Sequence, residues 1–119
     1  MFQSLILVGV GGMIGSIARF LIGNILKSNS LPFGTLLVNL TGSLLIGFLM
    51  AKFGKQALQE EWRLLFVVGV CGGFTTLSAL SWENLQLLQS GKYALFTGYS
   101  LLTLLGGLAL TAGGYYLGK

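Results

Sequence analysis

The chain has 119 residues, of which 54% are hydrophobic and only 8% are charged, with a mean hydropathy of +0.83 and a formal net charge of +4. A water-soluble domain of this size does not need so much apolar surface, so the composition indicates a membrane protein. Histidine and aspartate are absent, and the only glutamates are Glu60, Glu61 and Glu83. The acid, base and nucleophile sets of most hydrolytic or transfer enzymes cannot be assembled from these residues, so we do not expect an enzyme.

Four stretches are long and apolar enough for membrane-spanning helices, which need about 20 residues each. They cover residues 2–26, 33–51, 63–88 and 93–117. The connections between them are too short to fold on their own, so we expect one all-α transmembrane domain over residues 1–119. The first apolar run has no basic n-region and no small-residue cleavage site, so we expect it to be retained. The chain is therefore expected to be a multi-pass protein of the cell inner, or plasma, membrane.

The basic residues and the single cysteine bear on partners and topology. Cys71 alone can form neither a disulfide nor a metal cluster within one chain. The basic residues form no face interleaved with aromatic residues, so we expect no nucleic-acid partner. On the membrane side shared by both termini lie Lys52, Lys55, Arg63 and Lys119; on the other lie Lys27 and Lys92, with Arg19 close by. This weak charge bias permits insertion in both orientations, which leads to the hypothesis of an antiparallel, dual-topology dimer.

Polar and small residues recur at every fourth position in three of the spans. The stripes are Gly11, Gly15, Arg19 and Gly23; Thr35, Asn39, Ser43 and Gly47; and Tyr99, Thr103, Gly107 and Thr111. Small residues let membrane helices pack closely, which is the interpretation we favour for the glycines. The stripe that contains Asn39 is open to a second interpretation, because an amide at mid-membrane depth is costly and such groups often line a substrate path.

Arg19 lies about two thirds of the way along the first span and has three possible roles. Its side chain can snorkel to the nearer interface, as long basic side chains do. It can place a fixed positive charge at a pore mouth, where it would attract anions. It can also pair with Glu83, the only acidic residue within a span. The sequence leaves all three open.

The third span contains the segment GVCGGFTTLSALSWE, residues 69–83, which is a poor continuous helix. A break at Gly72-Gly73 and the following hydroxyl residues would free backbone groups that lipid cannot satisfy. Broken spans are tolerated where they line a cavity or coordinate an ion, so a break predicts an ion site. The alternative is an unbroken helix whose small residues form a packing seam.

Three segments together resemble the signature sequences of the Fluc (CrcB) family of small fluoride channels. They are GGMIGSIARF (11–20), GTLLVNLTGSLLIG (34–47) and GVCGGFTTLSALSWE (69–83), in the order and at the separations of that family. The resemblance covers nearly the whole chain. It implies four transmembrane helices with the third broken, two subunits packed antiparallel around two narrow pores, and export of fluoride that lowers its cytoplasmic level and confers fluoride resistance.

The resemblance also implies roles for individual residues. Asn39 matches the asparagine that faces fluoride in the pore, and Arg19 matches an arginine near the aqueous vestibule. The carbonyls of Gly72 and Thr75, from both subunits, match those that hold a structural Na⁺. Further pore positions are Thr76, Leu77, Ser78 and Leu80 around the break, and Tyr99 and Thr103 on the fourth helix. Such a pore needs hydrogen-bond donors without a charge that would trap the ion.

One departure from the family concerns the segment LSAL, residues 77–80, where the family usually has FSTF. Leu77 and Leu80 are apolar but lack the electropositive ring edge that a phenylalanine offers an anion. The chain is therefore expected to be a homodimeric channel, or a non-conducting or partly conducting subunit that pairs with a paralogous partner. A small multidrug exporter of similar size is a further alternative, but cationic drugs require an acid in the membrane where this first span carries Arg19.

Overall fold

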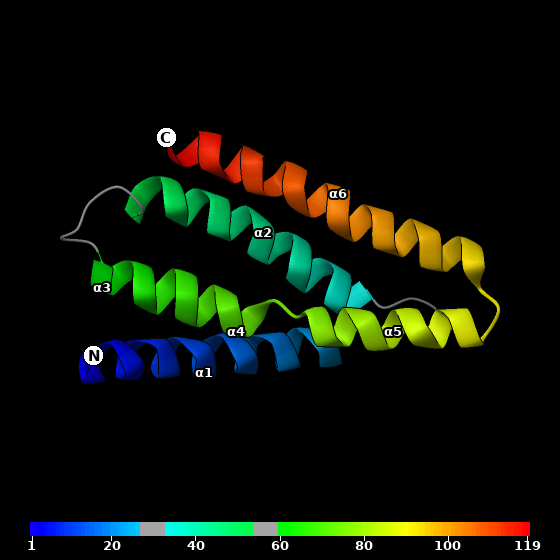
Figure 1. Cartoon of the computed structure of the whole chain (residues 1–119), viewed down its shortest axis with the longest axis horizontal. Helices are drawn as coiled ribbons and strands as arrows, with labels where there is room; N and C mark the ends of the chain where they lie inside the picture. Colours follow the sequence, from blue (N-terminus) through cyan, green and yellow to red (C-terminus); the bar gives the residue numbers. More distant parts are fainter. Residues whose placement is uncertain (27–32, 54–59) are drawn as a thin grey trace.

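A computed structural model describes residues 1–26, 33–53 and 60–119, and each regular element in these ranges is helical. In chain order they are α1 (Phe2–Ile25), α2 (Phe33–Phe53), α3 (Glu60–Arg63), the π-helical segment η2 (Leu64–Cys71), α4 (Gly72–Phe74), α5 (Leu77–Gln89) and α6 (Tyr93–Gly118). Figure 1 shows them side by side as an elongated bundle, with the two termini at the same end. Lys27 and Lys55, which entered the predicted charge balance, lie outside the described residues.

Four helical stretches are long and apolar enough to cross a membrane: Phe2–Ile25, Phe33–Phe53, the interrupted Glu60–Gln89, and Tyr93–Gly118. At about 1.5 Å per residue, even the 21 residues of α2 extend roughly 32 Å, which matches a hydrocarbon layer of about 30 Å. Their outward faces carry large apolar side chains such as Ile17, Leu104 and Leu108, all more than half exposed. A lipid environment covers such faces without cost, so the expectation of an all-α protein with four long apolar helices is confirmed.

Glycines bring α1 against the first half of the third span. A Cβ added at Gly11 would collide with the Leu65 carbonyl and lie 2.9 Å from the Gly69 Cα atom. A Cβ at Gly15 would meet the Val70 carbonyl and lie 2.8 Å from the Phe74 nitrogen. These backbones approach more closely than any side chain allows, as small residues permit in membrane bundles. The packing role expected for the first stripe is therefore confirmed for these two glycines.

The most extensive helix pair is α2 against α6. A Cβ added at Gly47 would clash with the Thr111 carbonyl and lie 2.9 Å from the Tyr115 nitrogen, and Gly114 faces the Leu44 carbonyl in the same way. The Thr111 hydroxyl donates to the Ser43 carbonyl at 3.0 Å across the interface. The polar stripes of the second and fourth spans therefore face one another inside the bundle.

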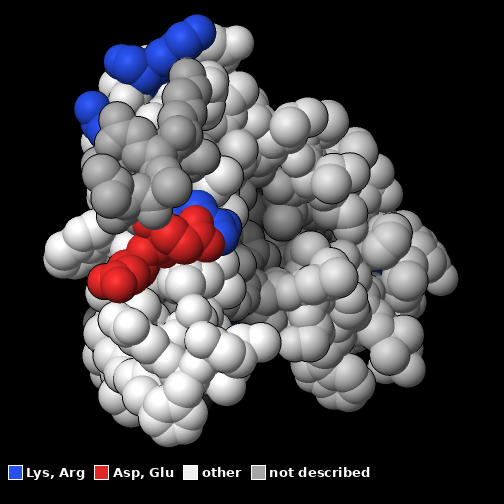
Figure 2. Space-filling view, turned by 60° about the vertical axis from the view of Figure 1, so that its left-hand side comes forward, with Lys and Arg blue, Asp and Glu red and all other residues white. Residues whose placement is uncertain are grey.

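The end of the bundle at α3 combines charge with stacked aromatic rings. The Arg63 Nε donates to the Glu60 carboxylate at 2.9 Å, and the Glu60 side chain is about half exposed while that of Arg63 is 29% exposed. Trp62 stacks on Phe66 with ring centroids 5.8 Å apart, and Phe66 stacks on Phe53 at 6.3 Å. In Figure 2 most of the charged side chains in view gather on one side. Tryptophan beside charged groups is typical of the membrane–water interface.

The third span is broken between α4 and α5. Thr75 and Thr76 have extended backbones, with φ/ψ of −82°/156° and −151°/122°. The interpretation of this segment as an unbroken packing helix is therefore wrong. Gly72 itself stays helical. A Cβ added at Gly73 would lie only 3.0 Å from the Gly12 Cα atom. The glycines thus allow close approach of α1, and the two threonines form the break.

Candidate functional site

The break begins at Thr75, and the N–H of the next residue, Thr76, turns toward α2. That N–H donates to Asn39 Oδ1 at 2.9 Å, and Asn39 Nδ2 donates to the Thr76 carbonyl at 3.2 Å. The single amide side chain therefore satisfies both backbone groups of one extended residue. In a bilayer these groups have no water to bond, so each would otherwise cost several kcal/mol. Asn39 is placed to hold the break open.

Thr76 also begins the second half of the span, because its side chain caps α5. The Thr76 Oγ1 accepts from the Ala79 N–H at 3.1 Å, which is the usual N-cap hydrogen bond. The Ser78 Oγ lies 3.2 Å from the same oxygen. The hydroxyls of Thr76 and Ser78 thus stand together at the first turn of α5, beside backbone N–H groups that carry the positive end of the helix dipole.

The break leaves two backbone carbonyls without the N–H donors that they would have in a continuous helix. In a continuous helix the Thr76 N–H would bond the Gly72 carbonyl and the Ala79 N–H would bond the Thr75 carbonyl. Both donors are instead engaged by side chains, those of Asn39 and Thr76. Gly72 and Thr75 line the same groove, and nothing lies within 4 Å of a Cβ built on Gly72. These oxygens are therefore open acceptors for a hard cation or for another donor.

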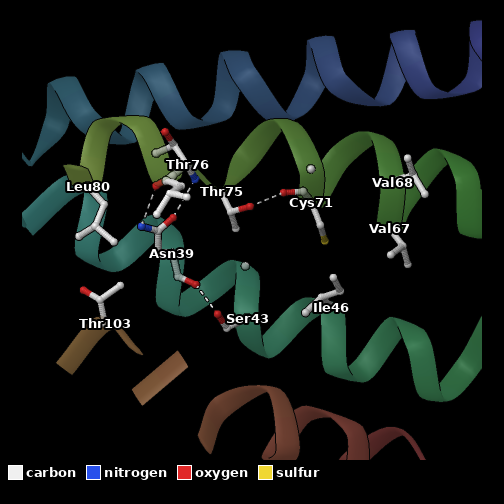
Figure 3. A pocket seen from close by; sticks show the side chains of 13 residues that line it. Asn39, Ser43, Ile46, Val67, Val68, Cys71, Thr75, Thr76, Leu80 and Thr103 are labelled. Carbon is white, nitrogen blue, oxygen red and sulfur yellow. Dashed lines mark hydrogen bonds between the residues drawn. The ribbon is translucent and has the colours of Figure 1, made fainter. Parts of the chain in front are cut away.

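A groove of about 540 Å³ runs along this face of the break. Figure 3 shows Asn39, Ser43, Thr75 and Thr76 around its polar part, with Ile46 and Val68 toward the apolar end. Leu77 and Leu80 also line it, and Leu77 is 75% exposed. The structure thus brings together seven residues that were expected at the pore or at the cation site: Asn39, Gly72, Thr75, Thr76, Leu77, Leu80 and Thr103.

Arg19 lies on the other side of the break, in a hollow of about 420 Å³ that Thr35, Thr76 and Ala79 also line. Its Nε donates to the Gly73 carbonyl at 3.1 Å. The half-buried guanidinium therefore stabilises the carbonyl end of α4, as cations do at helix C-termini. The Nε group of Arg19 therefore has a partner within the protein, while the snorkelling interpretation stays a prediction.

Glu83 does not pair with Arg19, the partner considered for it from the sequence. Its carboxylate accepts hydrogen bonds from the Thr35 hydroxyl and, at 3.2 Å, from the Tyr99 hydroxyl. Within the residues that the structure describes, the only ion pair is Arg63 with Glu60, so an Arg19–Glu83 pair is not formed. Glu83 instead joins α2, α5 and α6 through hydroxyl groups. The Thr35 hydroxyl is thereby committed to a carboxylate, although this residue lines the hollow that contains Arg19.

Two α6 hydroxyls are buried without a partner in the described part of the chain, those of Ser100 and Thr103. Thr103 was expected to lie on a polar path, and it lines the groove beside Leu80. Ser100 and the carbonyl of Gly73 were missed by the sequence analysis. Ser100 could have been found, because it lies three residues before Thr103 and so shares its helix face.

The CrcB-like protein family, described as Camphor Resistance (CrcB), matches residues 6–115. The chain belongs to this family. A relative from Gloeobacter violaceus named "Fluoride-specific ion channel FluC" is 47% identical over 100% of this chain and 98% of its own length. One of the same name from Leptospira interrogans serovar copenhageni is 45% identical over 98% and 95%. "Fluoride-specific ion channel FluC 1" of Yersinia pestis is 45% identical over 93% and 90%.

Membership of the CrcB-like family settles the class of protein. The match extends over all four apolar helices, so the resemblance noted from three short motifs is confirmed along the chain. The chain is a multi-pass membrane protein and not an enzyme. The small multidrug exporter loses its support, since the first span carries Arg19 and the family match includes that residue.

Proposed function

We propose that the chain forms a fluoride-selective channel in the plasma membrane, which exports fluoride and lowers its cytoplasmic concentration. The observation that carries the proposal is the broken third span, together with relatives named as fluoride-specific channels over nearly the whole length. A break lined by amide and hydroxyl groups offers hydrogen-bond donors within the membrane. Fluoride holds its water tightly, so a path for it must replace that water with such donors and avoid a charge that traps the ion.

The arrangement around the break supports this path. Asn39 uses its Oδ1 and one N–H on Thr76, which leaves its second N–H free to donate. Leu77 and Ser78 provide N–H groups at the first turn of α5, where the helix dipole favours an anion. Arg19 adds a positive charge in the hollow behind the break. The neutral N–H groups bind a small anion without a counter-charge at the break. The Arg19 charge attracts the anion from the hollow behind it.

The functional unit that we propose is an antiparallel dimer. A single chain leaves the groove beside the break open on one side, with Leu77 three-quarters exposed and Gly72 bare. A second copy in the opposite orientation would cover this groove. Cysteine labelling at Lys52 and at Lys92, which lie at opposite ends of the bundle, tests the arrangement. Both sites react from both sides of the membrane if the homodimer is antiparallel, whereas one-sided labelling of each would contradict it.

A Na⁺ ion fits the break as a structural cofactor. The carbonyls of Gly72 and Thr75 have lost their helical donors, both residues line the open groove, and two copies would double the number of oxygen ligands. Oxygen ligands of this kind suit a hard cation. When bound, the ion supplies positive charge that offsets unpaired carbonyl oxygens. The two chains would thereby be joined at their breaks.

Leu77 and Leu80 favour a second candidate function, that of a subunit in a heterodimer. Neither leucine offers the electropositive ring edge that an aromatic residue would direct at an anion. A paralogous partner with phenylalanines at these positions would supply it. In that case the chain alone conducts slowly or not at all, while still forming half of the pore.

Reconstitution of the purified chain into liposomes loaded with potassium fluoride tests the proposal. Fluoride efflux, followed with a fluoride electrode in the presence of a potassium ionophore, is expected from the chain alone, with chloride retained in parallel vesicles. Absence of fluoride efflux from the chain alone would contradict the homodimeric channel. Restoration of efflux by a co-expressed paralogue would then identify the heterodimer.

A further inference from the structure

The C-terminal ends of α2 and α6 lie side by side (Figure 1), and each carries one lysine placed over an aromatic ring. The Lys52 ammonium lies 5.7 Å from the centroid of the Phe48 ring, one turn earlier in α2. The Lys119 ammonium lies 5.6 Å from the centroid of the Tyr116 ring in α6. A cation over the face of an aromatic ring is attracted by the charge distribution of the ring. Two long side chains are therefore held in defined positions on an exposed surface.

The close packing of α2 on α6 brings these two lysines into one neighbourhood. A Cβ added at Gly118 would lie 3.1 Å from the Phe48 Cδ2 atom and 3.1 Å from the Ala51 Cβ atom. Lys119 directly follows Gly118 in the chain. Lys52 likewise directly follows Ala51, and the ring beneath its ammonium is the one that lies beside the end of α6. The two cations thus belong to one patch that joins two helices.

This patch lies where the membrane meets water. The 21 residues of α2 extend roughly 32 Å and the 26 residues of α6 roughly 39 Å, so the ends of both helices reach the edge of a hydrocarbon layer of about 30 Å. Phe48 is 38% exposed and Tyr116 is 69% exposed, so the rest of the chain covers neither ring. Lysines at this level keep their apolar stems against the acyl region and their charge among the headgroups.

The carboxylates of the chain are engaged elsewhere. All three glutamates belong to the described residues: Glu60 pairs with Arg63, and Glu61 and Glu83 accept hydrogen bonds from neutral side chains. In the part of the chain that the structure describes, neither lysine of the patch is paired with a carboxylate, that of the final residue included. The carbonyl ends of α2 and α6 attract the lysines, but each carries only about half a negative charge. The ammonium groups therefore keep donors for an acceptor outside the chain.

We propose that Lys52 and Lys119, with the rings beneath them, form a site for the headgroup of an anionic phospholipid. A phosphodiester is negatively charged and accepts hydrogen bonds, and each ammonium offers three N–H donors. Basic residues at the ends of membrane helices recognise anionic lipids by this attraction. The acyl chains of the same lipid cover Phe48 and Tyr116, which a free phosphate ion would leave uncovered. Because one lipid contacts both helices, its binding stabilises the packing of α2 on α6.

The first experiment measures lipid binding to the full-length chain in detergent by native mass spectrometry. Phosphatidylglycerol should bind about tenfold or more tightly than phosphatidylcholine with the same acyl chains. Lys52→Gln and Lys119→Gln should each lower the affinity for phosphatidylglycerol by about fivefold. Lys92→Gln is the matched control, because it removes one exposed lysine at the other end of α6. Its affinity should remain within about twofold of that of the native chain.

The second experiment measures thermal unfolding of the same preparations with each lipid added. Phosphatidylglycerol should raise the unfolding midpoint of the native chain, whereas phosphatidylcholine and inorganic phosphate at the same concentration should not. The variant with both Lys52→Gln and Lys119→Gln should lose this rise. The variant with Lys52→Arg and Lys119→Arg should keep it, because arginine retains the charge and also stacks on aromatic rings. Raising the salt concentration should weaken the effect of the anionic lipid.

Three outcomes would overturn the lipid site. Affinity for phosphatidylglycerol that is the same in the native chain and in the double glutamine variant is the first. A loss of stability in that variant that is equal in both lipids is the second, because the lysines would then serve only the helix ends. Stabilisation by inorganic phosphate equal to that by phosphatidylglycerol is the third. None of these measurements uses fluoride efflux, so this inference and the proposed channel function can fail independently.

Discussion

Asn39 and Thr76 exchange two hydrogen bonds, one from the Thr76 N–H to the Asn39 side-chain oxygen at 2.9 Å and one from the Asn39 amide to the Thr76 carbonyl at 3.2 Å. The pair joins α2 to the point at which the third span is interrupted. Asn39 therefore has a structural task as well as its proposed place in the pore, and a substitution there should affect both stability and ion flux.

Asn39→Asp should abolish fluoride efflux and also destabilise the fold. The aspartate can still accept from the Thr76 N–H, but its second oxygen faces the Thr76 carbonyl, where the amide had donated. Losing that bond and opposing two acceptors should cost about 1–3 kcal/mol, and the negative charge should repel the permeating anion. Thermal unfolding in detergent and fluoride efflux are measured on the same preparation. Efflux equal to that of the native chain would contradict a pore role for Asn39.

Glu83→Gln should destabilise the protein, because the carboxylate accepts from both Thr35 and Tyr99. An amide presents one acceptor oxygen in place of two and carries no charge, so one hydroxyl loses its acceptor and both lose a charged partner. Hydrogen bonds to charged groups contribute about 1.5–3 kcal/mol, which sets the expected loss in the free energy of unfolding. Glu61→Gln is the control, since Glu61 bonds Gln3 at 3.3 Å on the exposed surface and should change stability by less than about 0.5 kcal/mol. Equal effects of the two substitutions would argue against a stabilising role for the partly buried Glu83.

Gly15→Ala should be more disruptive than Gly9→Ala on the same helix. A Cβ at Gly15 collides with the Val70 carbonyl, which is backbone and cannot rotate away, whereas a Cβ at Gly9 meets nothing within 4 Å. Overpacking of this kind costs about 1–3 kcal/mol, so α1 should separate from the third span at a lower temperature in Gly15→Ala. Thermal unfolding in detergent compares the two variants. A midpoint for Gly15→Ala that matches Gly9→Ala would mean that α1 does not pack here as described.

Sodium should stabilise the protein if the carbonyls of Gly72 and Thr75 hold it. A ligand at about 100 times its dissociation constant adds about 2.7 kcal/mol to the free energy of unfolding. Unfolding is followed in sodium chloride and in an equal concentration of a bulky organic cation chloride, which keeps ionic strength constant. Identical unfolding midpoints in the two salts would count against the site.

Leu77→Phe combined with Leu80→Phe should speed fluoride efflux from a homodimer. Each aromatic edge contact contributes about 0.5–1.5 kcal/mol, so two at the barrier could raise the rate by about tenfold. The native chain and the double variant are reconstituted at equal protein density. Fast, fluoride-selective efflux from the native chain with no gain in the variant would show that leucines suffice and that no phenylalanine-bearing partner is needed.

The sequence predicted the four apolar helices and the location of the break to within a few residues, because both depend on local composition. It did not show which residues of GGFTT, 72–76, form the break and which pack against α1. Glycine is compatible both with a break and with close packing, and which applies at Gly73 depends on α1, some 60 residues earlier in the chain. The π-helical geometry of Leu64–Cys71 carried no pattern in the sequence, since that run is uniformly apolar.

The charged residues within the spans show the same limit. The sequence left three roles open for Arg19. Its partner in the structure is the backbone carbonyl of Gly73. A backbone partner cannot be predicted from residue type, because every residue has a carbonyl. Glu83 accepts hydrogen bonds from Thr35 and Tyr99. Both residues belong to polar stripes that the sequence showed, one on the second span and one on the fourth. That the two stripes meet at Glu83 depends on how α2 and α6 pack, which a single sequence does not reveal.

The position of Trp62, which stacks on Phe66, indicates how deep in the bilayer the break of the third span lies. If the indole marks the headgroup level, the 13 residues from Arg63 to Thr75 carry the chain at most roughly 20 Å inward at about 1.5 Å per residue. Half of a bilayer of about 40–45 Å, headgroup regions included, is about 20–22 Å, so the interruption at Thr75 lies close to the bilayer midplane. A two-fold axis lying in that plane maps the midplane onto itself, so the interruptions of two oppositely inserted copies would meet at the same level.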